Sequence, residues 1–195
     1  MKVFLFNKNE FSENAIEDET IVRSKVELLN RSLEKEDRYT VIVAEQFPPV
    51  GKVFEKGLGL RDKNEKEQVA SGEIAMDAIK QRVIDKINEL CQKNIISGFE
   101  SNALGDVYIY DSEDVDQLNL IGAVASGGSV AYKCTCKADG VRKFYTHTNT
   151  QIKKVLGDAA ARKIALLQIA YTHKTAIASL NDYDSIVGYD INKGW

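Results

Sequence analysis

The sequence has little of several residue types that mark specialised protein classes. Its 195 residues include three cysteines, two prolines and one tryptophan. Three cysteines are few and odd in number, which argues against a disulfide framework and fits a reducing compartment. The two prolines stand together at positions 48 and 49. Neither can donate a ladder hydrogen bond, so they predict the end of a strand.

Long apolar runs and an excess of one charge are also missing. No apolar stretch approaches the roughly 20 residues of a membrane-spanning helix, and the apolar start of the chain is too short to predict a signal peptide. The 26 basic and 29 acidic residues give a net charge of −3, and neither half forms a basic arm. We therefore expect no general binding to nucleic acid or to a membrane.

What the chain does contain is enough apolar sequence for a core, since 44% of its residues are hydrophobic. The first 72 residues predict a small αβ module. We expect strands over 1–6 and 40–44, a helix over 17–35 and a short strand within 51–60. The charged run 61–67 predicts a loop or a hairpin tip. Ser71-Gly72 marks a predicted boundary between domains 1–72 and 73–195.

The second module predicts two principal helices and two β-hairpins. The first helix covers 73–97, with Ser71 or Gly72 as its cap and Gly98 at its end. A hairpin over 99–110 follows, with its turn at Gly105-Asp106, and a helix then runs from Asp111 or Ser112 to about 124. A second hairpin covers 130–146, with its turn at Asp139-Gly140, and a long helix follows to about 180. Thr148 and Gln151 match a capping box at the start of the long helix. A last strand is predicted at 185–191. The fold class is α+β, a helix–hairpin–helix–hairpin–long helix module preceded by a small αβ module.

Two of the cysteines and a histidine form the strongest candidate metal site. Cys134 and Cys136 share one face of a predicted strand, and His147 ends the returning strand. A fourth zinc ligand would come from Cys91, an acidic side chain or His173. Because one residue rather than two separates the cysteines, we favour a structural role in the hairpin core over a zinc site. A Cys–His nucleophile is weaker still, since no glycine elbow or orienting Asn is identifiable.

Other candidate clusters fit structural roles better than chemical ones. The acidic group Asp111, Glu113, Asp114 and Asp116 lacks the glycine of a calcium loop and suits a helix N-terminus. The pairs Gly57/Gly59 and Gly127/Gly128 lack the phosphate-binding fingerprints that would follow them. A lone His173 is more typical of packing or surface positions than of a ligand. We therefore expect no enzyme, cofactor or catalytic residue.

The long helix carries more apolar side chains than one buried stripe needs. The main face comprises Ile152, Val155, Leu156, Ala159, Ala160, Ile164, Leu167, Ala170, Tyr171, Ile177 and Ala178, and Leu166 and Ile169 lie outside it. Such a face is hard to bury in so small a domain. We favour packing on the 73–97 helix and the hairpins, and keep a surface for self-association or a partner as the alternative.

Several short motifs follow one another in a fixed order before an alanine-rich helix: Gly98-Phe99, Tyr110-Asp111-Ser112, Asp116-Gln117-Leu118-Asn119 and His147-Thr148-Asn149-Thr150-Gln151. In this order of motifs, the stretch from Met76 to Leu180 resembles a phage tail-associated family of unknown function, found at the C-terminal end of tail-fibre proteins and in tail-fibre assembly proteins. The resemblance implies no active site, and it leaves the first 72 residues uncovered.

Three functions follow as hypotheses. The resemblance implies a structural or assembly protein of a phage or prophage tail that contacts a tail-fibre or baseplate protein, in the host bacterial cytoplasm during assembly or in the virion tail. A homo-oligomer, notably a trimer, would match the symmetry of fibres. The alternatives are a zinc-binding module or metal-dependent enzyme using Cys134, Cys136 and His147, and a host-directed binding module.

Overall fold

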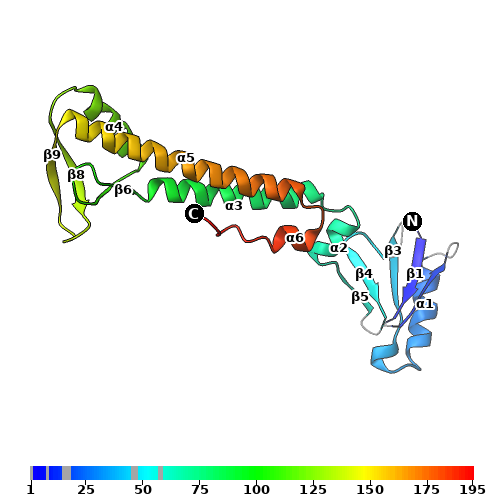
Figure 1. Cartoon of the computed structure of the whole chain (residues 1–195). Helices are drawn as coiled ribbons and strands as arrows, with labels where there is room; N and C mark the ends of the chain where they lie inside the picture. Colours follow the sequence, from blue (N-terminus) through cyan, green and yellow to red (C-terminus); the bar gives the residue numbers. More distant parts are fainter. Residues whose placement is uncertain (1, 8, 15–18, 45–47, 57–58) are drawn as a thin grey trace. The chain divides into compact units, whose positions relative to one another are not determined.

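The computed structural model describes residues 2–7, 9–14, 19–44, 48–56 and 59–195. The chain separates into two compact units, Met1–Ala75 and Met76–Trp195. In the sequence, the division between them falls three residues after the boundary predicted between 72 and 73. Both units mix helices with antiparallel sheet (Figure 1), and the predicted α+β class is confirmed.

The first unit holds two small sheets. β1 (Lys2–Phe6), β2 (Phe11–Asn14) and β3 (Thr40–Ala44) form an antiparallel sheet in the order β2–β1–β3, while β4 (Lys52–Glu55) pairs with β5 (Gly59–Asp62). The helices are α1 (Glu19–Asn30) and α2 (Glu65–Ala70), with a 3-10 turn at Lys35–Asp37. Val22 and Val26 of α1 are buried, with Tyr39 and residues of β1 and β3 packed against them. Residues 17 and 18 of the predicted first helix lie outside the described residues.

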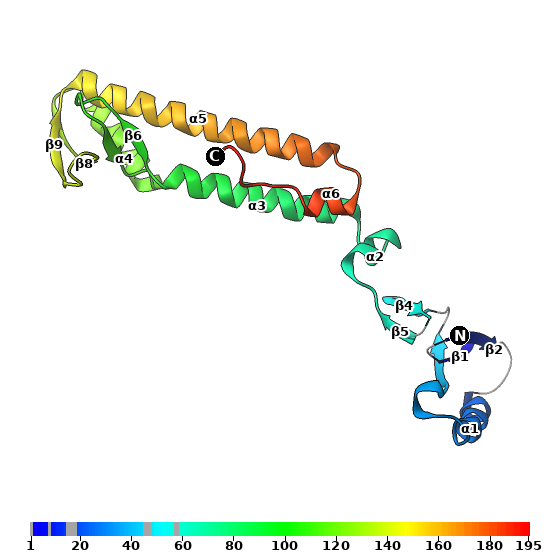
Figure 2. The same ribbon diagram turned by 60° about the horizontal axis from the view of Figure 1, so that its bottom comes forward.

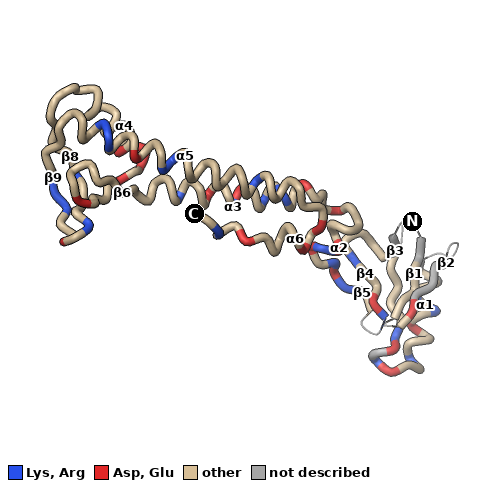
Figure 3. The backbone as a smooth tube through the Cα atoms, in the orientation of Figure 1, with Lys and Arg blue, Asp and Glu red and all other residues tan. Residues whose placement is uncertain are grey.

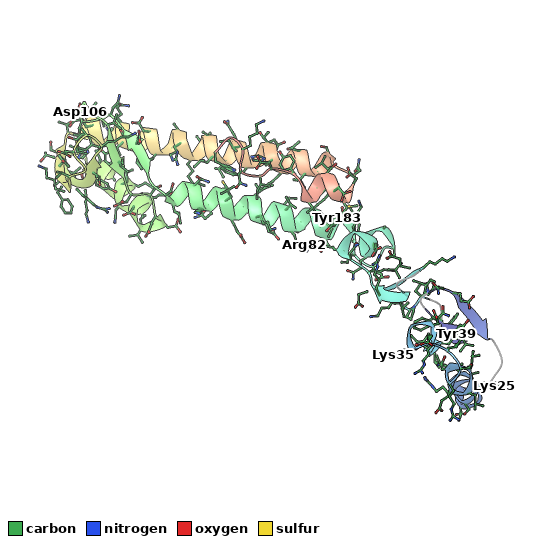
Figure 4. All side chains as sticks on the ribbon, turned by 90° about the horizontal axis from the view of Figure 1, so that it is seen from below. Lys25, Lys35, Tyr39, Arg82, Asp106 and Tyr183 are labelled. Carbon is green, nitrogen blue, oxygen red and sulfur yellow. The ribbon has the colours of Figure 1, made fainter. Side chains whose placement is uncertain are left out.

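The second unit is a helical hairpin with a sheet at one end. Its elements are α3 (Met76–Ile96), β6 (Phe99–Ser101), β7 (Tyr108–Tyr110), α4 (Asp114–Ala125), β8 (Val130–Cys136), β9 (Arg142–His147), α5 (Asn149–Ser179) and α6 (Tyr183–Val187). The four strands pair antiparallel in chain order. Figure 2 shows α3 and α5 side by side along their length, with the C-terminal segment running back along the hairpin. Asp106 lies at the sheet end and Tyr183 at the opposite end (Figure 4).

Two apolar clusters hold this unit together. Along the hairpin, Ile87, Cys91 and Ile95 of α3 pack with Leu166, Ala170 and Ile177 of α5, and the C-terminal residues Tyr189, Ile191 and Trp195 pack against them. Near the sheet, Phe99, Tyr110, Leu120, Cys134, Ile152 and Val155 form the second cluster. The buried residues of α3 are Ile79, Ile87, Cys91 and Ile95.

Gly98 makes the turn from α3 into the sheet. It has φ +94°, and a Cβ at this position would lie 2.8 Å from the carbonyl oxygen of Tyr110. Both conditions require glycine, because other residues rarely adopt such a φ and the neighbour here is backbone. The prediction of a left-handed cap at Gly98 is confirmed.

Two predictions about short segments are wrong. The charged run 61–67 is not a loop: β5 extends to Asp62, and α2 begins after Asn64 with a capping box to Glu67. The last strand predicted at 185–191 is absent from the described residues, since 183–187 form α6. The Asp182 carboxylate accepts a hydrogen bond from the amide of Ser185 at 2.9 Å, and this cap favours a helical turn.

The start of α4 also differs from prediction. Glu113, rather than Asp111 or Ser112, is the N-cap, in a capping box with Asp116. The side chain buried by α4 is Leu120, which is 3% exposed, whereas Leu118 is 68% exposed. The start of α3 differs as well: Ser71 and Gly72 close α2, and α3 begins only at Met76.

Candidate interaction surface

The candidate zinc ligands are buried but not gathered. Cys134 and Cys136 point into the core from β8, as the alternation predicted. His147 lies opposite Val130 in the β8–β9 register, whereas Cys134 lies opposite Lys143. This register separates the backbone positions of His147 and Cys134 by four residues along the ladder, which is about 13 Å at 3.3 Å per residue. The other proposed ligands lie on the helical hairpin, Cys91 on α3 and His173 on α5.

Both ring nitrogens of His147 already have partners. Nδ1 lies 2.8 Å from the carbonyl oxygen of Tyr145, which can only accept, so Nδ1 carries the proton. Nε2 therefore accepts from the hydroxyl of Tyr110 at 2.8 Å. Burial lowers the pKa of His147, which keeps the ring neutral. Among the described residues, no three His, Cys, Asp or Glu side chains are placed to hold a metal ion together.

The Cys–His nucleophile is not assembled either. Burial raises the pKa of the Cys134 thiol, so the reactive thiolate is disfavoured. The imidazole of His147 is engaged by Tyr110 and Tyr145. Cys134 and His147 are therefore core residues of the β8–β9 hairpin. Burial raises the pKa of Tyr110 as well, so its hydroxyl stays protonated and can donate to His147.

The acidic group around the start of α4 is divided among structural contacts. Asp111 pairs with Arg142 of β9, and the Asp116 carboxylate accepts from the amide of Glu113 at 3.1 Å. Of the glycine pairs, Gly127 turns the chain after α4 with φ +75°. Gly57 lies outside the described residues.

His173 anchors the C-terminal segment. It is 6% exposed, and its Nε2 donates to the carbonyl oxygen of Lys193 at 2.9 Å. Its Nδ1 lies 2.9 Å from the hydroxyl of Tyr189, and its ring stacks on Trp195 with centroids 5.7 Å apart. The histidine is thus a packing residue, as expected.

Large apolar side chains remain exposed on α4 and α5. They are Val115 (67%), Leu118 (68%) and Ile121 (53%) of α4, with Ile164 (56%), Leu167 (50%) and Tyr171 (72%) of α5. We call these six residues the α4–α5 face. The wide apolar stripe of α5 is thus divided: Ile152, Val155 and Ile177 are buried in the core, while Ile164, Leu167 and Tyr171 are not.

One series of exposed residues on α5 repeats every seven positions. Gly157, Ile164, Tyr171 and Ala178 are spaced by seven, with Ala160 and Leu167 at the intermediate positions, and all six are exposed. This spacing is that of the a and d positions of a coiled coil, where a second helix packs along the seam. Sequence inspection named five of these residues but placed them in one stripe with the core positions.

A small cavity adjoins this face where α4 meets α5. It has a volume of about 170 Å³ and is lined mainly by apolar side chains, including Phe99, Leu120 and Leu166. Ile121 of α4 and Ala160 of α5 also line it, and Lys163 donates across it to Gln117 at 2.9 Å. Of the six residues of the α4–α5 face, Ile121 lines the cavity.

A comparison with known proteins identifies the family of this chain through its second unit. Residues 78–192 match the family described as Domain of unknown function (DUF4376). The chain belongs to this family. The matched residues include the whole α4–α5 face and none of the first unit. No curated protein and no solved structure matches the chain.

Membrane insertion has no candidate among the helices of the described residues. None of them is long and apolar enough to cross a bilayer.

Proposed function

We propose that this member of the DUF4376 family is a structural or assembly protein of a phage or prophage tail. In this role it contacts a tail-fibre or baseplate protein in the host bacterial cytoplasm during assembly, or in the virion tail. The order of motifs from Gly98 to Gln151 supports the tail assignment through resemblance. The matched residues 78–192 span the same stretch.

The observation that carries the protein-contact role is the α4–α5 face. Single exposed apolar residues are ordinary on a protein surface, but three large ones at helical spacing on each of two packed helices are typical of an interaction site. The exposed fractions of 50% to 72% leave these side chains available for a partner. Burying one such side chain contributes about 1–3 kcal/mol.

Co-expression with candidate fibre and baseplate proteins tests this role. We expect one of them to co-purify with the full chain, and Leu118→Gln to reduce the recovered partner at least fivefold. Val187→Gln is the matched control, since Val187 is 53% exposed on α6, outside the face. Equal recovery with both variants, or no capture of any fibre or baseplate protein, would contradict the proposal.

A further inference from the structure

Helix α4 packs along only the first half of α5. The side chain of Asn149 at the start of α5 donates to the carbonyl oxygen of Gly127, just beyond the end of α4, at 2.5 Å. Lys163 in the middle of α5 bonds to Gln117 in the second turn of α4. Helix α4 therefore runs antiparallel to α5 and covers its first half. The repeat residues from Ile164 to Ala178 continue beyond the start of α4 and stay exposed.

The length of this bare segment matches α4 itself. From Ile164 to Ala178 the axis advances about 21 Å, and the twelve residues of α4 span about 18 Å, at 1.5 Å per residue. Helix α4 also exposes an apolar side of its own through Val115, Leu118 and Ile121. Its exposed side and the bare half of α5 are thus two apolar strips of similar length on neighbouring helices.

The two strips carry opposite charges. Helix α4 contains Asp114 and Asp116 and no Lys or Arg, and Glu113 precedes it. The bare half of α5, from Ile164 to Ala178, contains Lys174 and no Asp or Glu. Figure 3 marks the positions of Lys and Arg and of Asp and Glu along the chain. Opposite charge favours α4 against α5 over pairing of two basic α5 helices.

We infer that two copies of this chain pair about a two-fold axis, with α4 of each copy packing on the bare half of α5 in the other. The two-fold arrangement buries both strips of both copies, because the exposed side of α4 in each chain packs on the bare half of α5 in the other. In this arrangement, Leu118 of one copy lies near Tyr171 of its partner. The inference rests on the proposed contact role of the face, but it requires no fibre protein.

Mass in solution and a cross-link together test the pairing. Light scattering on the purified full chain should give twice the chain mass of 21.7 kDa. Tyr171→Gln should raise the dimer dissociation constant at least tenfold, because an exposed aromatic in the centre of an apolar interface is a typical hot spot. Val187→Gln should leave it unchanged. Circular dichroism and Trp195 fluorescence check that each variant is folded.

The cross-link identifies which helices meet. The three native cysteines are buried, so surface cysteines introduced at two positions supply the accessible thiols. The double variant Leu118→Cys/Tyr171→Cys should form an intermolecular disulfide on oxidation, and the pair Val187→Cys/Tyr171→Cys should form several-fold less. A monomeric mass at all concentrations, a mass three times that of the chain, or equal cross-linking by both pairs would overturn the pairing. A monomer that still captures a fibre protein would overturn this inference and leave the proposed function standing.

Discussion

Adjacent leucines in α5 offer the sharpest test of how the helical hairpin is packed. Leu166 is 3% exposed and belongs to the cluster with Ile87, Cys91 and Ile95, whereas Leu167 is 50% exposed. Replacing either by alanine makes the same chemical change in the same helix turn. The difference in helix propensity is therefore common to both variants. What differs between them is the loss of buried contacts.

The expected costs are well separated. Leu166→Ala removes a fully packed side chain and leaves a cavity, which typically lowers the free energy of unfolding by about 3 kcal/mol within a range of 2–5. Leu167→Ala should cost about 1 kcal/mol or less, because half of its surface already faces water in the monomer. With a urea slope near 2 kcal/mol per molar, the first variant should lose roughly 1.5 M in its unfolding midpoint.

The chain's single tryptophan makes the measurement specific to the second unit. Trp195 stacks on His173 and packs against the α3–α5 cluster, so its fluorescence reports unfolding of the hairpin. Urea titrations at a dilution that excludes dimers should be followed by fluorescence and by circular dichroism. Equal midpoints for Leu166→Ala and Leu167→Ala, or a larger loss for Leu167→Ala, would refute the assigned orientation of α5.

Three further predictions concern the sheet end of the second unit. Tyr110→Phe should lower the free energy of unfolding by about 1–3 kcal/mol, because it leaves Nε2 of His147 buried without a donor, and an unchanged urea midpoint would contradict this hydrogen bond. The pKa of His147 is lowered by burial, so the unfolded chain binds the extra proton first. Stability should be full above the unfolded pKa of about 6.5 and fall by up to about 1.4 kcal/mol per unit as pH drops below it. Urea midpoints between pH 7.5 and 5 measure this slope, and a midpoint that rises on acidification would be inconsistent with a neutral buried ring. Gly98→Ala should destabilise the unit by more than 1 kcal/mol, because a Cβ would lie 2.8 Å from the backbone oxygen of Tyr110 at φ +94°; a variant with wild-type melting temperature would contradict the close approach.

Local chemistry explains the elements that sequence inspection placed correctly. The capping box of Thr148 and Gln151, the turn at Asp139-Gly140 and the left-handed Gly98 each depend on residues a few positions apart. Asn64 and Glu67 carry a signal of the same kind, a capping box that starts α2 where a charged loop was predicted. Such features require no knowledge of distant parts of the chain.

The spacing of residues in the sequence could not decide whether the candidate zinc site exists, because its geometry depends on contacts between distant residues. Cys134, Cys136 and His147 share the inward face of one hairpin, as alternation predicts, but the register separates them and Tyr110 from the neighbouring strand takes the remaining nitrogen of His147. Whether an inward-facing cysteine or histidine meets a ligand partner or a tyrosine is decided by strand pairing.

The residue pattern alone predicts that this chain mixes helices with hairpins and that α5 has more apolar surface than one neighbour can cover. Which side of α5 is buried depends on contacts with the other elements. Leu166 faces α3 while Ile164, Leu167 and Tyr171 face outward, although all four are apolar and close in sequence. The same holds for α4, where Leu120 rather than Leu118 enters the core. When apolar residues surround a helix, periodicity leaves its rotation open, and the packing of the other elements against it selects the side that is buried.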